Sequence, residues 1–376
     1  MIKVPYNRPL VLGEEAEYIK EVINNDQFSG NGIISKKCNK VIEEKTGTKK
    51  CIMTSSCTDA LEMAALLCDF EPGDEVIMPS FTFVSTASAF ALRRANIVWC
   101  DIRPDTKNID ETKIEGLVSA KTKAIVVVHY AGVACEMDKI GEICRKHNIL
   151  LIEDAAQAID CYYKAKHLGS IGDFGAFSFH ETKNIQCGEG GALLVNNKNL
   201  SDRAEFIRDK GTNRIHFNKG KVDKYTWVEL GSSFLMSELQ AAFLYPQLLK
   251  SSQVNADRME SWKYYYDSLS DLIPSERLPF VPDECKINGH IFYFLTKTNE
   301  ERNELIQYLK DNGIVAIFHY VPLHRAPYWK GKYDGLELEN TDKISQTLIR
   351  LPLYYKMRRD EIDFVVDKIK EFHNKR

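Results

Sequence analysis

Long hydrophobic runs are missing from this sequence: no apolar stretch reaches the roughly 18–20 residues that a membrane helix needs. The N-terminus, from Met1 to Pro5, also lacks the apolar run of a signal peptide. The 10 cysteines are scattered and include no Cys-x-x-Cys pair, which is untypical of a disulfide-stapled secreted domain. These absences predict a soluble cytoplasmic protein with reduced cysteines.

No single sign of charge dominates the chain. Its 50 Lys and Arg residues face 53 Asp and Glu residues, which gives a net charge of −3. This balance gives no reason to expect a nucleic acid or an anionic membrane as the main partner. The sequence has no Walker A motif and no His-Glu-x-x-His spacing, and Gly169, Gly172 and Gly175 do not match the dinucleotide fingerprint. ATP, NAD and metal chemistry are therefore disfavoured.

The first two-thirds of the chain alternates helical patterns with short apolar runs. Such alternation is typical of an α/β fold, and nearly continuous aliphatic runs suit strands buried on both faces of a mostly parallel sheet. The expected helices are 14–25, 57–69, 83–93, 111–118 and 136–147, and the expected strands are 50–54, 74–78, 97–101, 123–128 and 149–153.

The pattern changes after about residue 235. A long helix is expected over 235–270, followed by a strand at 291–295, a helix at 299–312, a short strand at 314–318 and a final helix at 359–373. A chain of 376 residues is longer than one typical unit of about 100–200 residues. We therefore expect a large domain, residues 1–250, and a smaller C-terminal α+β domain, residues 251–376.

One candidate site residue is Asp154, which follows Glu153 at the end of the apolar run Ile149–Ile152. Open α/β sheets bind their ligands at the carboxyl ends of their strands. A buried carboxylate there needs a partner, and the protonated ring nitrogen of pyridoxal phosphate (PLP) is one such partner. Gln157, on the following turn, could reach the ring oxygen of that cofactor. A simple helix cap at Asp154 is an equally good interpretation of its position alone.

A second candidate is Lys183, just beyond the short strand expected at Phe177–Phe179. Burial lowers the pKa of a lysine, and the neutral amine is the form that attacks an aldehyde. A tight turn follows at Gly188–Gly191. A single loop lysine is more often a surface residue, but the combination with Asp154 and the glycines favours a functional role.

A phosphate group also needs a binding site, and the stretch Thr54–Leu61 lies between a strand and a helix. Free N–H groups and small hydroxyl residues at a helix N-terminus bind anions well. Ser178 could add a hydroxyl group. An ordinary Ser/Thr N-cap is the alternative. Phe83 could stack on a flat ring, although an isolated Phe is usually a core residue.

The same residues resemble a known family. The stretches Ser56–Leu61, Pro79–Thr86, Val128–Gly132, Glu153–Gln157, Phe177–Asn184 and Phe318–His324 are similar to motifs of the DegT/DnrJ/EryC1/StrS family of sugar aminotransferases. The resemblance covers nearly the whole chain. It implies the type I PLP-dependent transferase (aspartate aminotransferase) fold and PLP as cofactor.

The resemblance also implies a role for each residue at the cofactor. Lys183 would form the Schiff base, Asp154 would pair with the pyridine nitrogen, and Gln157 would contact the ring oxygen. Some relatives with histidine in place of the lysine are sugar dehydratases, and others have regulatory roles. Lys183, Asp154 and Gln157 together favour an aminotransferase.

In the same comparison, Ser178 and the backbone at Cys57 and Thr58 would hold the phosphate. Phe83 occupies the position of the aromatic residue that stacks on the ring. His319 and His324 match a C-terminal motif that lies near the substrate in relatives.

Many relatives place an Asn from the neighbouring subunit on the phosphate, but the matching stretch Gly231–Glu238 contains none. Ser232 or Ser233 is expected to substitute for it. The resemblance thus implies a homodimer with composite active sites.

Within the family, the stretches His129–Asp138, Lys210–Arg214 and Val222–Trp227 are most similar to enzymes that aminate C4 of dTDP-4-keto-6-deoxy-D-glucose with L-glutamate as donor. The implied product is dTDP-4-amino-4,6-dideoxy-D-galactose, for cell-surface polysaccharide synthesis. Amination at C3, or a gluco-configured product, stays open because no physical argument from the sequence separates these outcomes.

Overall fold

The computed structural model describes residues 3–333, 335 and 337–375, so Met1 and Ile2 lie outside it. Within this range the largest sheet has the strand order β1-β9-β8-β5-β4-β2-β3. Its strands are β1 (Lys50–Thr54), β2 (Glu75–Pro79), β3 (Asn96–Cys100), β4 (Thr122–Val128), β5 (Leu150–Asp154), β8 (Phe174–Ser178) and β9 (Gly191–Val195). Only β9 runs antiparallel to its neighbours in this sheet, which confirms the predicted α/β fold with a mostly parallel sheet.

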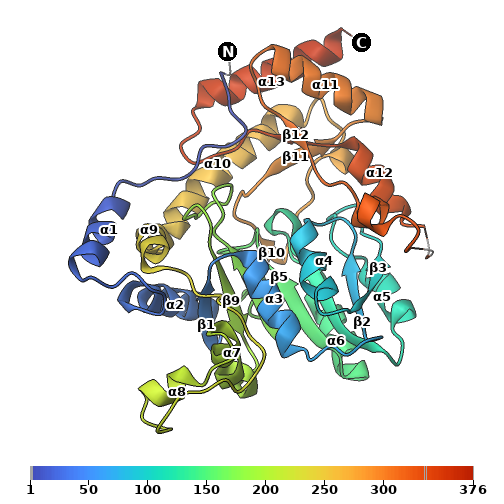
Figure 1. Cartoon of the computed structure of the whole chain (residues 1–376). Helices are drawn as coiled ribbons and strands as arrows, with labels where there is room; N and C mark the ends of the chain where they lie inside the picture. Colours follow the sequence, from blue (N-terminus) through green and yellow to red (C-terminus); the bar gives the residue numbers. More distant parts are fainter. Residues whose placement is uncertain (1–2, 334, 336, 376) are drawn as a thin grey trace.

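Helices cover both faces of the large sheet (Figure 1). Successive strand side chains point to opposite faces. Ile125 and Val127 of β4 therefore join one buried cluster, and Ala124 and Val126 join the other. The first cluster includes side chains from α2 (Ile33–Thr46), α5 (Glu111–Leu117), α6 (Met137–His147) and α9 (Glu238–Leu249). The second includes side chains from α3 (Cys57–Leu67), α4 (Val84–Ala91) and α7 (Ser201–Arg208).

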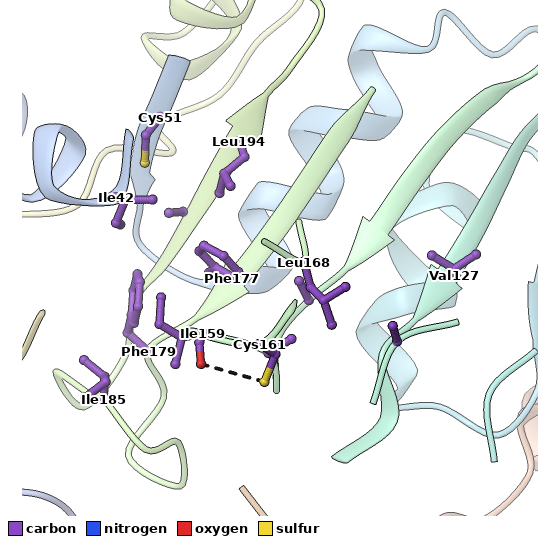
Figure 2. Packing of buried hydrophobic residues seen from close by; sticks show 14 of the residues in the cluster. Ile42, Cys51, Val127, Ile159, Cys161, Leu168, Phe177, Phe179, Ile185 and Leu194 are labelled. Atoms are coloured by element: carbon purple, nitrogen blue, oxygen red, sulfur yellow. Dashed lines mark hydrogen bonds between the residues drawn. The ribbon is translucent and has the colours of Figure 1, made fainter. Parts of the chain in front are cut away.

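The first cluster also fixes the loop that follows β8 (Figure 2). Phe179 and Ile185, one on each side of Lys183, are both fully buried in it. Burial of one such side chain contributes about 1.5–3 kcal/mol. The backbone of this loop is further closed by the N–H of Cys187, which donates to the Phe179 carbonyl oxygen. The segment that carries Lys183 is therefore held at both ends.

Helix α2 was not expected from the sequence. The residue at its N-cap position, Gly32, has no side chain that could cap the helix. Instead, the buried Glu238 carboxylate of α9 accepts hydrogen bonds from the N–H groups of Gly32 (3.0 Å), Ile34 (2.7 Å) and Ser35 (3.2 Å). The capping group is therefore far away in the sequence, which hides this helix from local pattern analysis.

The C-terminal part builds a third core cluster above the large sheet in Figure 1. It consists of α10 (Ser251–Leu269), α11 (Asn299–Asp311), α13 (Arg359–Asn374) and the antiparallel sheet β11-β13-β12 (Phe292–Leu295, Leu348–Leu351, Ile317–Phe318). Val4, at the start of the described chain, also belongs to this cluster and bridges to Ile314. The division of the chain at residue 250 stays a prediction.

The helix expected over 235–270 is two helices, α9 and α10, which meet at Lys250. The first of them begins only at Glu238, because Ser237 forms a capping box with Gln240. The shorter elements are α1 (Glu15–Asn24), α8 (Arg214–Asn218), α12 (Glu339–Thr347) and the small sheet β10-β6-β7 (Cys285–Lys286, Tyr162–Tyr163, Lys166–His167). No helix in the described part of the chain is both long and apolar enough to cross a membrane.

Candidate active site

A cavity of about 560 Å³ lies between the carboxyl ends of β5 and β8 and the C-terminal part of the chain. The structure brings most of the predicted site residues to its wall: Cys57, Thr58, Phe83, Asp154, Gln157, Ser178, Lys183 and His319. The wall also includes residues that the sequence analysis did not single out, among them Tyr6, Thr86, His290, Tyr320 and Arg350.

Asp154 is the last residue of β5, and its side chain is 6% exposed. Its Oδ2 accepts a hydrogen bond from Thr86 Oγ1 at 2.7 Å, and its Oδ1 accepts one from the Ala156 N–H at 3.1 Å. The helix cap considered for this residue is wrong, because residues 155–161 form turns and no helix; the carboxylate closes a turn instead, with only one oxygen. The carboxylate is fixed in orientation and still faces the cavity.

The preceding residue, Glu153, points to the opposite side of the sheet, as strand alternation requires. It is fully buried and accepts hydrogen bonds from the N–H groups of Gly169 (2.7 Å) and Gly172 (2.6 Å), and it contacts His129 Nε2 at 2.9 Å. These contacts satisfy the Glu153 carboxylate inside the protein. Of the two adjacent acids, only Asp154 is available to a ligand.

Gln157 is held by both ends of its amide. Its Oε1 accepts from the Ala131 N–H at 2.7 Å, and its Nε2 donates to the Tyr320 hydroxyl at 3.0 Å. Burial raises the pKa of Tyr320, so its hydroxyl group stays protonated. Gln157 is thus a fixed polar group at the cavity wall beside Asp154.

Lys183 sits in the turn between β8 and β9, where its N–H donates to the His180 carbonyl oxygen at 2.9 Å. Burial lowers the pKa of its amine, while the nearby Cys57 and Asp154 act in the opposite direction. Among the described residues no hydrogen-bond acceptor or salt-bridge partner holds the side-chain nitrogen. The result is a lysine that can be neutral and that projects into a cavity with a carboxylate.

The N-terminus of α3 offers backbone N–H groups that can bind an anion. Ser56 caps the helix, since its side chain accepts from the Asp59 N–H at 3.0 Å. The N–H groups of Cys57 and Thr58 belong to the first turn, where a helix offers no acceptor. A Cβ on Gly191 would lie 2.4 Å from the Cys57 nitrogen, so β9 can approach this turn only with glycine.

His319 and Tyr320 form part of the cavity wall that the C-terminal part of the chain contributes. His319 stacks on Tyr320 with ring centroids 3.8 Å apart, and its Nδ1 lies 3.3 Å from the Tyr130 hydroxyl. Burial, with the charge of Lys183, lowers the pKa of His319 to about 3. The ring is neutral, and because Arg350 Nη1 donates to its Nε2, the proton resides on Nδ1.

Three predicted site residues lie elsewhere. His324 does not line the cavity: its Nδ1 hydrogen-bonds Ser80 Oγ at 2.7 Å, and its Nε2 lies 3.4 Å from Asp342. Ser232 and Ser233 are exposed, and Ser232 lines a separate hollow with Leu92. Within this chain, neither serine reaches the wall of the Lys183 cavity.

The residues missed by sequence reasoning act mostly through those it found. Thr86 orients Asp154, Tyr320 orients Gln157, and His290 is a buried histidine whose pKa is lowered by burial and by Lys183. Tyr320 lies inside the conspicuous stretch Phe318–His324, so its position was available in the sequence. Thr86 likewise lies inside the stretch Pro79–Thr86, whereas His290 and Arg350 carried no local signal.

These residues fit PLP. The cavity offers an amine for its aldehyde at Lys183 and a fixed carboxylate for its ring nitrogen at Asp154. The first turn of α3 offers unpaired N–H groups for its phosphate. Phe83, 60% exposed at the start of α4, adds an aromatic face.

Comparison with known proteins agrees with this fit. The model of the DegT/DnrJ/EryC1/StrS aminotransferase family matches residues 11–370. The spore coat polysaccharide biosynthesis protein SpsC of Bacillus subtilis is 32% identical over 98% of this chain and 96% of its own length.

Two solved structures share the fold over nearly the whole chain. DesV of S. venezuelae is 26% identical with a TM-score of 0.90, and the match covers 99% of both chains. Spr1654 of Streptococcus pneumoniae in its PLP form is 24% identical, also with a TM-score of 0.90 and 99% of both chains covered. The latter is known in a PMP form as well. The chain therefore belongs to the DegT/DnrJ/EryC1/StrS aminotransferase family and is a PLP-dependent sugar aminotransferase.

Proposed function

We propose that this enzyme moves the amino group of L-glutamate to C4 of dTDP-4-keto-6-deoxy-D-glucose and forms dTDP-4-amino-4,6-dideoxy-D-galactose for a cell-surface polysaccharide. The observation that carries the transfer is the Lys183 amine, with its lowered pKa, in one cavity with Asp154. The choice of sugar rests on the likeness of residues 129–138, 210–214 and 222–227 to C4-aminating relatives.

Lys183 is the proton carrier in this proposal. PLP, when bound, supplies an aldehyde for the donor's amino group and a ring that holds the electron pair of the broken C–H bond. Lys183 would hold PLP through its amine, and, once released by the donor's amino group, this neutral amine would remove the proton from the donor's Cα and carry it. The same amine would carry a proton in the reverse sense when the sugar is the substrate.

Asp154 and the first turn of α3 would hold the two ends of the cofactor. The Asp154 carboxylate, already oriented by Thr86, would keep the ring nitrogen protonated and so favour the withdrawal of electrons into the ring. The N–H groups of Cys57 and Thr58, with the Ser178 hydroxyl, would bind the phosphate. Phe83 would cover the ring face.

A homodimer with shared sites is part of the proposal. Helix α4 begins just after the exposed Phe83, by the cavity, and ends just before Leu92, which is 60% exposed. Leu92 lines a hollow with Ser232 and with Leu230, which is 62% exposed. Exposed apolar side chains therefore lie at both ends of α4, between the cavity and the segment expected to reach a neighbour's phosphate, together with the charged Glu62 and Arg93. A second copy of the chain would cover them.

The product identifies the reaction. Purified enzyme with PLP, L-glutamate and dTDP-4-keto-6-deoxy-D-glucose should give a 4-amino sugar of galacto configuration by NMR, with one 2-oxoglutarate formed per amine. An amine at C3, a gluco product or a deoxygenated sugar would contradict the proposed substrate or reaction. A change of the cofactor's absorbance on adding glutamate alone tests the donor separately.

A further inference from the structure

Arg350, on β13, is a buried cation without a counter-ion. Its side chain is 6% exposed, it lines the cavity, and none of the described carboxylates lies within 4 Å of its guanidinium group. Its Nε has no hydrogen-bond partner. A buried charge is costly unless it is paired, so an unpaired guanidinium at a cavity wall indicates that an anion binds there.

The other buried arginines do not share this situation. Arg258 donates to the carbonyl oxygens of Gly289 (3.1 Å), His290 (2.7 Å) and Leu353 (3.1 Å). Arg302 donates to the Ser345 carbonyl oxygen at 2.7 Å.

Arg208 is also buried, and it forms a 2.5 Å ion pair with Glu205. Each of these three side chains finds an oxygen acceptor inside the protein, whereas the guanidinium of Arg350 is left facing the cavity.

The orientation of Arg350 is fixed before any ligand arrives. Its Nη1 donates to His319 Nε2, and its guanidinium lies 4.8 Å from the centre of the Tyr6 ring. His319 is itself held by Tyr130 and by stacking on Tyr320. The planar fork of a fixed arginine matches the two oxygens of a carboxylate.

We propose that Arg350 binds the α-carboxylate of the amino-acid donor, an inference that rests on the proposed function. Arg350, His319 and Lys183 line the same cavity, and His319 contacts the guanidinium and lies close enough to Lys183 for its charge to lower the pKa of the ring. The α-carboxylate of an amino acid is attached to the same carbon as its amino group. It therefore has to lie close to the lysine that the amino group replaces.

The charged part of the sugar substrate does not meet this requirement. The reacting C4 of the sugar carries no charged neighbour, and the diphosphate is attached at C1, across the ring. A diphosphate also carries two charges, and Arg350 offers one. The same guanidinium would bind the keto acid that forms from the donor, because that product keeps the carboxylate.

The test separates the two half-reactions through the cofactor's absorbance. In Arg350→Met, the L-glutamate concentration for half-maximal rate should rise at least 30-fold, and the half-reaction with the 4-amino sugar should stay within threefold of wild type. L-Glutamine as donor should show the same loss, which separates the α- from the side-chain carboxylate. Arg350→Lys should recover part of the effect.

Two controls keep the outcome decisive. Arg302→Met removes another buried guanidinium, away from the cavity, and should leave glutamate saturation unchanged. Calorimetric binding of glutarate, an unreactive dicarboxylate, to the PLP-loaded enzyme should be lost in Arg350→Met. A loss confined to the sugar half-reaction would overturn the proposal and assign Arg350 to the diphosphate. A wild-type enzyme that ignores glutamate but reacts with another amino acid would contradict the proposed donor, and Arg350 would then be tested with that donor.

Discussion

At the scale of single residues, the site depends on which of two neighbouring groups is free. Glu153 and Asp154 are adjacent, yet backbone N–H groups satisfy the first and leave the second facing the cavity. The sequence favoured Asp154 from its place at a strand end, and strand alternation then separates the two acids. The contact from Thr86 could not be foreseen, because it joins residues from different elements.

Lys183→Ala should reduce amino transfer by at least about 1,000-fold, since a positioned acid–base group contributes about 10²–10⁴-fold and the covalent attachment is lost as well. Single-turnover conversion of the cofactor by glutamate measures this effect. Binding of PLP itself should persist, because the phosphate contacts stay in place. A variant that transfers amine at the wild-type rate would remove Lys183 from the mechanism.

The lowered pKa of Lys183 also has a consequence for the apoprotein. Folding holds this amine partly neutral, so the unfolded chain binds more protons and the burial cost is present when pH lies below the lysine's ordinary pKa. Lys183→Met should therefore raise the unfolding free energy of the apoprotein at pH 7, and the gain should shrink as the pH rises toward 10. Denaturant titration at both pH values measures it. An equal gain at both would show that packing, and not charge, explains the change.

Thr86→Val should weaken the enzyme without abolishing activity. The Thr86 hydroxyl donates to Asp154 at 2.7 Å, and the Thr82 hydroxyl oxygen lies 2.7 Å from the Thr86 hydroxyl oxygen. Loss of one hydrogen bond to a charged group costs about 1.5–3 kcal/mol, which corresponds to a 10- to 150-fold weaker hold on PLP. Equilibrium titration with PLP measures this. Thr112→Val, at an exposed position, is the matched control and should bind normally.

At the scale of elements, sequence patterns located five of the seven strands of the large sheet well, whereas β8 (Phe174–Ser178) was expected only at Phe177–Phe179 and β9 was not expected. The expected strands from 50–54 to 149–153 lie within one residue of the observed ones at each end. Their continuous aliphatic runs indicate burial on both faces of the sheet, and such runs are visible in the local sequence. Helix α2 and strand β13 were missed because their support comes from distant segments, Glu238 in one case and β11 and β12 in the other.

Glu238→Gln should destabilise the protein by about 2–4 kcal/mol, because a buried charge-assisted cap on α2 is lost. The free energy of unfolding from urea titration measures this, and the loss should appear as a lower midpoint. Glu44→Gln, an exposed change on the same helix, is the control. An equal effect of both changes would mean that the cap carries no special stabilisation.

At the scale of the whole molecule, the cavity combines two parts of the chain that the sequence analysis treated separately. Strand β5 supplies Asp154, the turn between β8 and β9 supplies Lys183, and the C-terminal part supplies His319, Tyr320 and Arg350. Patterns of period two or 3.6 identify elements but hold no information on how two sets of elements meet. This explains why the strand-end residues were predictable and the opposite wall was only partly so.

Leu92→Asp should weaken self-association at least tenfold, because it places a carboxylate where an exposed apolar side chain lines the hollow with Leu230 and Ser232. Sedimentation over a range of concentrations measures the change, and affinity for PLP should fall with it if the neighbour completes the phosphate site. Phe280→Asp, at an exposed aromatic position in the C-terminal part, is the control. Unchanged sedimentation of a Leu92→Asp dimer would place the interface elsewhere.

The bridge between Val4 and Ile314 joins the start of the described chain to its C-terminal part, and the same N-terminal segment brings Tyr6 to the cavity beside Arg350. A ribosome synthesises about 5–20 residues per second, so it makes Val4 and Tyr6 long before Ile314 and Arg350. The large sheet can assemble while translation continues, but the cavity wall with Tyr6 and Arg350 cannot form until residue 350 has been made. On the proposed role of Arg350, a nascent chain should therefore become able to hold PLP before it can select an amino acid.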